Sequence, residues 1–329
     1  MKNFNFTDLA QKSINKGSIE SKDIIKIINA PDDKLLEILN TAWIVRKRFF
    51  KNNVRIHILN NVKSGGCQED CKYCSQSIQS KNKDIIYPMK SEKEVLNDAG
   101  NAYRKGAFRY CMAFSGKELS LNYIKKIATI VKKIKKLYPS LEICVSAGFL
   151  DKERAMILKE AGTDRYNHNI NTSFKFYKNI CTTHDYKERI KTIYTAKNAG
   201  MTLCCGVIIG MGEEDKDIIY MLEDLKRIKP ESIPVNFFIP VKGHRIKNPN
   251  YLTPQKCLKI LCAFRLTLPE TELRIAAGRE YHLKSLQALA LYPANSLFAE
   301  GYLTSSGDDI EKTKSLIKEA GFIIERIEI

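Results

Sequence analysis

Residues 54–74 read VRIHILNNVKSGGCQEDCKYC, and the rest of the chain is best interpreted outward from this stretch. Its first six residues, Val54–Leu59, are mostly apolar and β-branched, which predicts a buried strand. A glycine pair follows, and then Cys67, Cys71 and Cys74 stand in the spacing C-x3-C-x2-C. Thiolates are soft ligands suited to iron–sulfur clusters and zinc, so the loop after this strand is a candidate metal site.

From this stretch onward, strand-like runs alternate with helix-like segments. The candidate strands are short, apolar and often bounded by Gly, Pro or Asn: Val54–Leu59, Phe108–Ala113, Glu142–Ala147, Arg165–Ile170, Thr202–Ile209, Ile233–Ile239, Leu273–Ala276 and Ser296–Phe298. The candidate helices are Ser91–Lys105, Leu121–Leu137, Lys152–Ala161, Tyr186–Ala199, Asp215–Ile228, Pro254–Leu266 and Glu280–Leu291. Gly106, Gly162 and Gly200 each follow a helical run, and Asp151 and Thr253 stand at N-cap positions. Such a series predicts parallel strands with right-handed crossovers, and eight units close an α/β barrel of the (β/α)8 TIM type.

The barrel is expected to span residues 54–302, with an extension at each end. Residues 1–53 contain two apolar groups, which predict small amphipathic helices packed on its outside: Ile24, Ile25, Ile27 and Ile28, then Leu35, Leu36 and Leu39. Residues 303–329 predict a helix around Asp309–Ala320 and a strand-like run ending at Ile329, packed on the barrel as a C-terminal extension.

Composition narrows the class of protein. Hydrophobic residues make up 44% of the chain and charged residues 28%, as in an ordinary globular protein. The absence of a long apolar run and of an apolar signal core predicts a cytoplasmic protein without a membrane partner. The net charge of +17 invites a nucleic-acid partner, but the lysines are spread over many segments, so none is expected. Ten cysteines in a chain of 329 residues indicate metal or redox chemistry rather than disulfides.

The three-cysteine loop favours an iron–sulfur cluster over the alternatives, which are a structural zinc loop and three unrelated core cysteines. Structural zinc normally takes four ligands, and the sequence near Cys67, Cys71 and Cys74 offers no fourth Cys or His. Three thiolates on a four-iron cluster instead leave one iron open to a small molecule.

The spacing and the preceding glycine pair resemble the radical S-adenosylmethionine superfamily. The resemblance implies that Cys67, Cys71 and Cys74 hold a 4Fe–4S cluster whose open iron chelates S-adenosylmethionine, which is cleaved to a 5′-deoxyadenosyl radical. It also implies that Tyr73 lies beside the adenine.

Further chemistry-bearing residues stand on other predicted strands. Cys111, Cys144, Cys204 and Cys205 lie on strands two, three and five, and Arg274 lies on strand seven. Each cysteine alone is most simply a small core residue. Together with an inward arginine, however, they indicate a second cluster inside the barrel.

Several segments from about Val45 to the C-terminus resemble the biotin synthase family: Tyr166–Ser173, Gly206–Glu213, Arg274–Glu280, Ala294–Phe298 and Tyr302–Thr304. The resemblance implies that Cys111, Cys144, Cys204 and Arg274 hold an auxiliary 2Fe–2S cluster, thought to donate the sulfur inserted into dethiobiotin. Cys205 stays an alternative to Cys204; strand alternation points only one of them inward, and the motif spacing favours Cys204.

The same resemblance assigns binding roles to amides. It implies that Asn167, Asn169, Asn171 and Arg189 lie around S-adenosylmethionine, and that Asn169, Asn236 and Thr304 contact the substrate. No catalytic residue is implied beyond the cluster ligands, and His168 is given no chemistry. The sequence departs from the family pattern at two places. Asn171 stands where many members have Asp. Lys242–Arg245 differs from the family's usual residues, so the family does not predict the geometry of that loop.

The family likeness also implies a homodimer and an electron donor such as flavodoxin or ferredoxin. The nearest rival is another barrel-type radical enzyme, a hydrogenase-maturation or amino-acid-rearranging relative, which need not carry the second set of ligands. A basic RNA-binding protein is a weaker rival. Cys181, Cys257 and Cys262 fit no ligand pattern, and the last two are expected to pack in the core.

Overall fold

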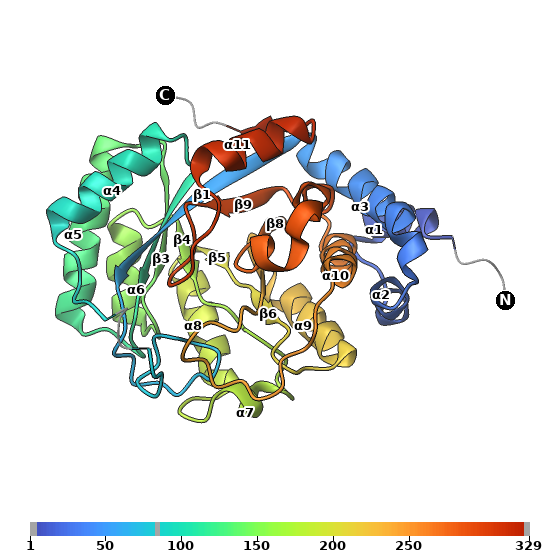
Figure 1. Cartoon of the computed structure of the whole chain (residues 1–329). Coiled ribbons are helices and arrows are strands. Elements are labelled where there is room, and N and C mark those ends of the chain that lie inside the picture. The colour runs from blue at the N-terminus through green and yellow to red at the C-terminus, as the bar shows by residue number, and fades with distance from the viewer. Residues whose placement is uncertain (1–4, 83–85, 326–329) are drawn as a thin grey trace.

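The computed structural model describes residues 5–82 and 86–325, and it forms a closed barrel of parallel strands surrounded by helices (Figure 1). The strands that close it are β1 (Asn53–Lys63), β2 (Arg109–Phe114), β3 (Glu142–Ser146), β4 (Arg165–Asn167), β5 (Thr202–Cys204) with β6 (Val207–Ile209), β7 (Ser232–Phe237), β8 (Glu272–Ile275) and β9 (Ser296–Ala299). Neighbours pair in chain order, and β9 pairs with β1 to complete the circle. The predicted α/β barrel is therefore confirmed.

The helices that return the chain to the start of the next strand cover the outside of the barrel (Figure 1): α4 (Glu92–Arg104), α5 (Leu121–Leu137), α6 (Lys152–Glu160), α8 (Tyr186–Asn198), α9 (Asp215–Ile228) and α10 (Pro254–Thr267). A short helix, α7 (Tyr177–Ile180), lies in the loop between β4 and α8. The Asp151 and Thr253 side chains accept backbone N–H bonds as the predicted N-caps. Gly106, Gly162 and Gly200 all have positive φ, as their position after a helix requires. Within the described residues, none of the helices combines the length and apolar content needed to cross a membrane.

The N-terminal extension packs against α10. It contains α1 (Thr7–Lys16), which the sequence did not predict, α2 (Ser21–Ile28), the 3-10 turn η1 (Asp32–Lys34) and α3 (Leu35–Phe50). Ile24, Ile27 and Ile28 are buried as predicted. Leu36 was expected on the buried face but is 72% exposed, because the face of α3 that meets the barrel carries Leu35, Ile38 and Leu39.

At the other end, α11 (Ile310–Glu319) is followed by β10 (Ile323–Ile324), which pairs with β1 at Asn53 and Val54. The predicted helix is confirmed. The rest of the predicted strand, up to Ile329, lies outside the described residues.

The segment predicted as one helix over Glu280–Leu291 is helical but irregular. It consists of a π-helix, η2 (Arg279–Leu283), and a 3-10 helix, η3 (Lys284–Leu291). Arg279 is buried there and bonds both Glu280 and Gln287, and Lys284 adopts a positive φ between the two segments. The segment therefore departs from a regular α-helix at the point where the buried Arg279 makes these bonds.

Candidate active site at the carboxyl ends of the strands

The three-cysteine loop begins directly after β1. Gly65 and Gly66 have φ of 74° and 63°, so both adopt the left-handed region that glycine tolerates best. A Cβ on Gly65 would lie only 2.5 Å from Ile86 Cγ1, so the close approach of Ile86 to this backbone also requires glycine at position 65. The pair turns the chain so that Cys67, Cys71 and Cys74 follow at the mouth of the barrel.

The surroundings of these thiols fit a cluster site. Backbone N–H groups of Glu69 and Gly116 bond the Cys67 sulfur, and those of Gln76 and Ser77 bond the Cys74 sulfur. Burial raises the pKa of the Cys74 thiol to about 11, although these N–H groups favour the thiolate. N–H groups directed at the sulfur stabilise the thiolate that a cluster iron requires.

Acidic side chains fasten the loop to the segment that follows α7. The Asp70 carboxylate accepts from the Thr182 backbone N–H at 2.8 Å and from the Thr183 backbone N–H at 3.2 Å. The Glu69 carboxylate contacts His184 and accepts from the Thr183 hydroxyl at 2.7 Å. These bonds fix the position of the loop relative to the fourth strand–helix unit.

The same segment brings an unexpected residue to the site. The Cys181 sulfur lies 3.7 Å from the Cys71 sulfur and 3.3 Å from His184 Nδ1. The three side chains form a compact group of metal-ligating type. Sequence reasoning missed Cys181 and His184; their only signal was a Cys and a His three residues apart in a loop.

The predicted cofactor-binding residues converge beneath this loop. Asn171, at a φ of 66°, donates from its amide to the Tyr73 hydroxyl at 2.7 Å. Arg189 Nε donates to the Asn169 carbonyl at 2.5 Å. The Asn169 side chain accepts from Asn167 at 3.2 Å and from the Gly206 N–H at 2.9 Å. The five residues thus form two bonded groups, and all five line the same cavity.

The second cysteine group lies inside the barrel. Cys111 and Cys144 are register partners on β2 and β3, and the Cys144 thiol bonds both Cys111 and Cys204. Cys204 belongs to this inner group, whereas Cys205 is buried in the separate outer core. The hydrogen bond from Cys144 and the charges of Arg274 and Arg109 hold the pKa of Cys204 well below its usual value despite its burial. Neighbouring charges and bonds lower the pKa of Cys111 and Cys204, whereas the bonds that Cys144 makes to both raise its own pKa. Three neighbouring cysteine sulfurs of this kind fit an iron–sulfur cluster.

Arg274 completes the group. Its Nη1 lies 3.5 Å from the Cys204 sulfur, and its guanidinium stacks 5.0 Å from the centre of the Phe298 ring. Its Nε is buried without a hydrogen-bond partner in the described chain, which leaves a donor available to a bound group.

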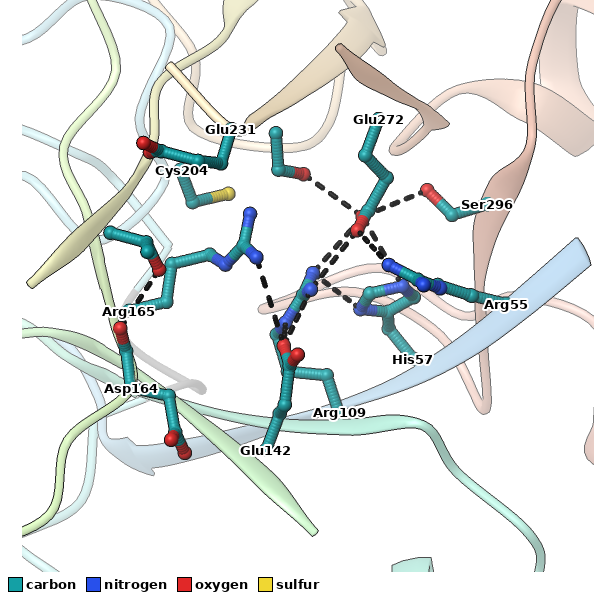
Figure 2. Close-up of polar contacts among 12 residues, drawn as sticks. Arg55, His57, Arg109, Glu142, Asp164, Arg165, Cys204, Glu231, Glu272 and Ser296 are labelled. Carbon is teal, nitrogen blue, oxygen red and sulfur yellow. Dashed lines mark hydrogen bonds and ion pairs between the residues drawn. The ribbon is translucent and has the colours of Figure 1, made fainter. Parts of the chain in front are cut away.

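Below Arg274, the floor of the barrel holds a dense ionic network. Figure 2 shows Arg55, His57, Arg109 and Ser296 pointing toward the Glu272 carboxylate. Burial opposes ionisation of Glu272, but the charges of Arg109 and Arg274 outweigh it and hold the pKa of the carboxyl well below its usual range. The sequence did not predict this network.

One cavity of about 380 Å³ joins the two cysteine groups. The three loop cysteines line it at the mouth, and the inner cysteines with Arg274 line it within the barrel. Predicted substrate contacts lie on its walls. Asn236 donates to the Val207 carbonyl at 2.9 Å and accepts from the Ala277 N–H at 3.1 Å, and the Thr304 hydroxyl lies 2.8 Å from that of Ser75.

His168 also lines the cavity, and its ring packs against Phe149 at 5.3 Å and Tyr166 at 6.4 Å. Burial holds its pKa well below the usual value, so the ring is neutral. The buried Cys257 and Cys262 belong to the outer core, as predicted.

Family models match most of the barrel. The model of the radical SAM superfamily matches residues 61–225, and the model of the biotin and thiamin synthesis associated domain matches residues 234–323. Two solved structures share the fold. A methylornithine synthase aligns with a TM-score of 0.82 at 17% identity, covering 97% of each chain. A maturase of the [FeFe]-hydrogenase aligns with a TM-score of 0.83 at 18% identity, covering 98% of this chain and 75% of the other. At these identities the likeness shows the fold alone.

Curated relatives are much closer in sequence. A biotin synthase of Leptospira interrogans is 49% identical over 93% of this chain and 87% of its own length. Those of Magnetococcus marinus, at 45% over 92% and 94%, and Bacillus licheniformis, at 40% over 98% and 96%, are also similar. With such identity over nearly the full length, this chain belongs to the biotin synthase family of radical S-adenosylmethionine proteins.

Proposed function

We propose that this chain carries out the biotin synthase reaction, the insertion of sulfur into dethiobiotin to form biotin. The observation that carries the proposal is the single cavity that reaches from the three loop cysteines to the inner cysteines and Arg274. A substrate held in it contacts both the place where a radical is generated and the place where sulfur is available.

We assign Cys67, Cys71 and Cys74 to a 4Fe–4S cluster, and Tyr73, Asn167, Asn169, Asn171 and Arg189 to S-adenosylmethionine. When bound, this pair supplies a 5′-deoxyadenosyl radical able to remove hydrogen from an unactivated C–H bond. Asn171 and Tyr73, already bonded to each other, offer a flat polar platform for a nucleoside. Arg189 is a half-buried cation on the cavity wall, where it can pair with an anionic group of the cofactor.

We assign Cys111, Cys144, Cys204 and Arg274 to a 2Fe–2S cluster, which supplies the sulfur. Two supports for this assignment are the Cys144 thiol, which bonds both Cys111 and Cys204, and an arginine with an unpartnered nitrogen. The role of the chain is to hold these groups in a closed apolar interior, with Phe298 and Leu59 packed beside them, where a carbon radical is shielded from water.

We assign substrate binding to Asn169, Asn236 and Thr304. A carboxamide suits a cyclic urea, because it offers both donors and an acceptor. Asn236 is fixed by one donated and one accepted bond to the backbone, which leaves its second N–H and a lone pair for a ligand. A fixed amide orients the substrate without losing side-chain entropy on binding.

The activity is tested with the full chain, reconstituted with iron and sulfide without oxygen. Dethiobiotin, S-adenosylmethionine and an electron donor are added, and biotin and 5′-deoxyadenosine are measured. We expect both products. Deoxyadenosine without biotin, when both clusters are loaded, would favour a different radical enzyme and overturn the proposal.

The second cluster is tested with a matched pair of cysteine variants. Cys144→Ala is expected to remove the absorption of the 2Fe–2S cluster and leave the four-iron cluster in place. Cys205→Ala, which removes an equally buried thiol outside the inner group, is expected to change neither. Unchanged iron and sulfide in Cys144→Ala would contradict the ligand set.

We also propose that the chain forms a homodimer, which sedimentation can test. We propose an electron donor of the flavodoxin or ferredoxin type, and a cytoplasmic location, where thiols stay reduced.

We propose that the chain divides into the extension 1–53, the barrel 54–302 and the C-terminal extension 303–329. The pairing of β10 with β1 and the packing of α3 on α10 support extensions that fold with the barrel.

A further inference from the structure

We propose that Glu272 is a positioning residue for the sulfur-donating site: its carboxylate fixes the guanidinium of Arg274 so that one edge faces the Cys204 sulfur. This inference rests on the proposed function, since it takes Arg274 as part of the second cluster site. It concerns a residue on the floor of the barrel, outside the cavity wall.

The position of Glu272 follows from the strand. Glu272 and Arg274 are two residues apart on β8, so their side chains point to the same face, which is the barrel interior. Glu272 is 3% exposed and Arg274 1%. The carboxylate therefore lies one layer below the guanidinium, nearer the floor.

The bonds of Arg274 hold one guanidinium nitrogen, Nη2, and leave another, Nη1, near the Cys204 sulfur. Nη2 donates to Glu272 at 2.7 Å and to the Ser232 hydroxyl at 2.8 Å. Ser232 in turn donates to Glu272 at 2.9 Å, which closes a triangle. Phe298 lies against one face of the guanidinium, and Nη1, which takes part in none of these bonds, lies 3.5 Å from the Cys204 sulfur.

Glu272 is itself immobilised by its other partners. Arg109 grips it with two bonds of 3.0 Å, from Nη1 and Nη2, and Ser296 donates at 3.1 Å. Arg55 Nη1 lies 3.5 Å away and His57 Nε2 3.4 Å away. A carboxylate held from so many sides is a rigid anchor for Arg274.

The charge of Glu272 matters as well as its bonds. Arg109 and Arg274 repel each other, and Glu272 is the carboxylate that lies between them and bonds both. Neutralising it would leave two buried cations without their shared partner, a costly arrangement that displacement of Arg274 would relieve. We therefore expect Glu272→Gln to move Arg274 although the side chain keeps its size.

Glu142 provides a matched control. It is the second carboxylate on Arg109, with bonds of 2.8 Å from Nε and 2.7 Å from Nη2, and Figure 2 shows it across the Arg109 guanidinium from Glu272. None of its described bonds goes to Arg274. Glu142→Gln thus removes the same charge from the same network and leaves the anchor of Arg274 in place.

The test compares both variants with the unaltered chain after anaerobic reconstitution. The readouts are the absorption and the EPR spectrum of the reduced second cluster, with the four-iron cluster as an internal reference. We expect Glu272→Gln to change the spectrum of the second cluster only, and to lower biotin formed per deoxyadenosine about tenfold, as loss of a charge-assisted bond predicts. Glu142→Gln is expected to retain the original spectrum.

Two outcomes overturn the proposal: an unaltered second-cluster spectrum in folded Glu272→Gln, or an equal change in Glu142→Gln.

Combining Glu272→Gln with Arg274→Met supplies a further check, because an anchor that acts through Arg274 has no additional effect once Arg274 is gone. If Glu272→Gln does not fold, Glu272→Asp keeps the charge but shortens the side chain, which withdraws the carboxylate from Arg274 Nη2. A changed second-cluster spectrum then supports the anchor, and an unchanged one refutes it. Failure of the unaltered chain to form biotin would refute the proposed function, while the spectra would still decide the role of Glu272.

Discussion

At the scale of single residues, two cysteines that touch have different expected roles. Cys71 belongs to the three-cysteine spacing, and Cys181 lies 3.7 Å from it on another loop. We predict that Cys71→Ala loses the four-iron cluster after reconstitution, because two thiolates do not hold it. Cys181→Ala should retain the cluster. Iron and sulfide content and the visible absorption decide between them. Loss of the cluster in both variants would make Cys181 a ligand too.

Asn171 combines a chemical and a conformational requirement, which two substitutions separate. Both Asn171→Ala and Asn171→Gly remove the amide that bonds Tyr73, so we predict that each raises KM for S-adenosylmethionine about fivefold. At a φ of 66°, alanine is strained and glycine is not. Asn171→Ala should therefore be less stable than Asn171→Gly by about 1 kcal/mol in urea unfolding. Equal stability, or a KM change in the alanine variant alone, would contradict this separation.

At the scale of elements, the fifth strand position is interrupted where β5 ends and β6 begins. Gly206 lies in the gap, and a Cβ there would be 2.0 Å from the Pro234 carbonyl oxygen on β7. Its N–H also bonds the Asn169 side chain. The interruption therefore lets a backbone group reach the cofactor-binding amides, which an unbroken strand would not allow.

We predict that Gly206→Ala lowers the free energy of unfolding by about 3 kcal/mol, because rigid backbone opposes the new methyl group. Gly106→Ala is the control. It follows α4 at a φ of 82°, and a Cβ there meets nothing within 4 Å, so only strain of about 1 kcal/mol is expected. Urea unfolding measures both. Equal losses would show that the contact with β7 relaxes freely.

The elements were largely predictable because their signals are local. Apolar runs gave the strands, and Asp151 and Thr253 marked helix starts that the structure confirms. Alternation along a strand implied that only one of Cys204 and Cys205 points inward, and the family motif spacing favoured Cys204, which the structure places in the inner group. Sequence alone could not predict the irregular helix after Gly278, which depends on a buried arginine.

The missed site residues depend on tertiary contacts. Cys181 and His184 reach Cys71 only because a short helix, α7, returns the chain to the three-cysteine loop. Glu272 reads as an ordinary polar residue at the start of a strand. Its role appears only when β2 places Arg109 against it. Local patterns locate such residues in elements and leave their partners undetermined.

At the scale of the whole molecule, Arg46 joins the N-terminal extension to the barrel and the C-terminal segment. The side chain is fully buried, donates to the carbonyls of Ala294 at 3.1 Å and Asn53 at 2.8 Å, and lies 4.6 Å from the centre of the Phe322 ring. A cation bonded to carbonyls from several segments links parts of the chain that are far apart in sequence.

We predict that Arg46→Ala lowers the free energy of unfolding by about 3 kcal/mol and that the chain still unfolds in one transition, because the extension has no separate core. Lys47→Ala, next to it on α3 and exposed, should cost under about 0.5 kcal/mol. Circular dichroism and tryptophan fluorescence in urea test this, since Trp43 lies on α3. Two separate transitions would show that residues 1–53 are an independent domain.

The net charge of +17 bears on the proposed electron donor. Three basic side chains lie at the three-cysteine loop. Lys72 belongs to the loop and donates to the Asn179 carbonyl on α7. Lys117 lies 3.6 Å from Glu69, and Arg245 donates to the Asp70 carbonyl. A positive surface accelerates encounter with a negatively charged partner, and salt screens that attraction over about 10 Å at 0.1 M.

We predict that reduction of the four-iron cluster by an acidic flavodoxin slows about tenfold between low salt and roughly 0.3 M salt. Methyl viologen, a small cation, is repelled by the same surface, so its rate should rise or stay constant as salt increases. Stopped-flow absorption of the cluster measures both reductants on the same protein. Replacing Lys72 and Lys117 with glutamine should weaken the salt dependence with flavodoxin and leave the viologen reaction nearly unchanged. A flavodoxin rate that ignores salt would mean that the basic charge plays no part in electron delivery.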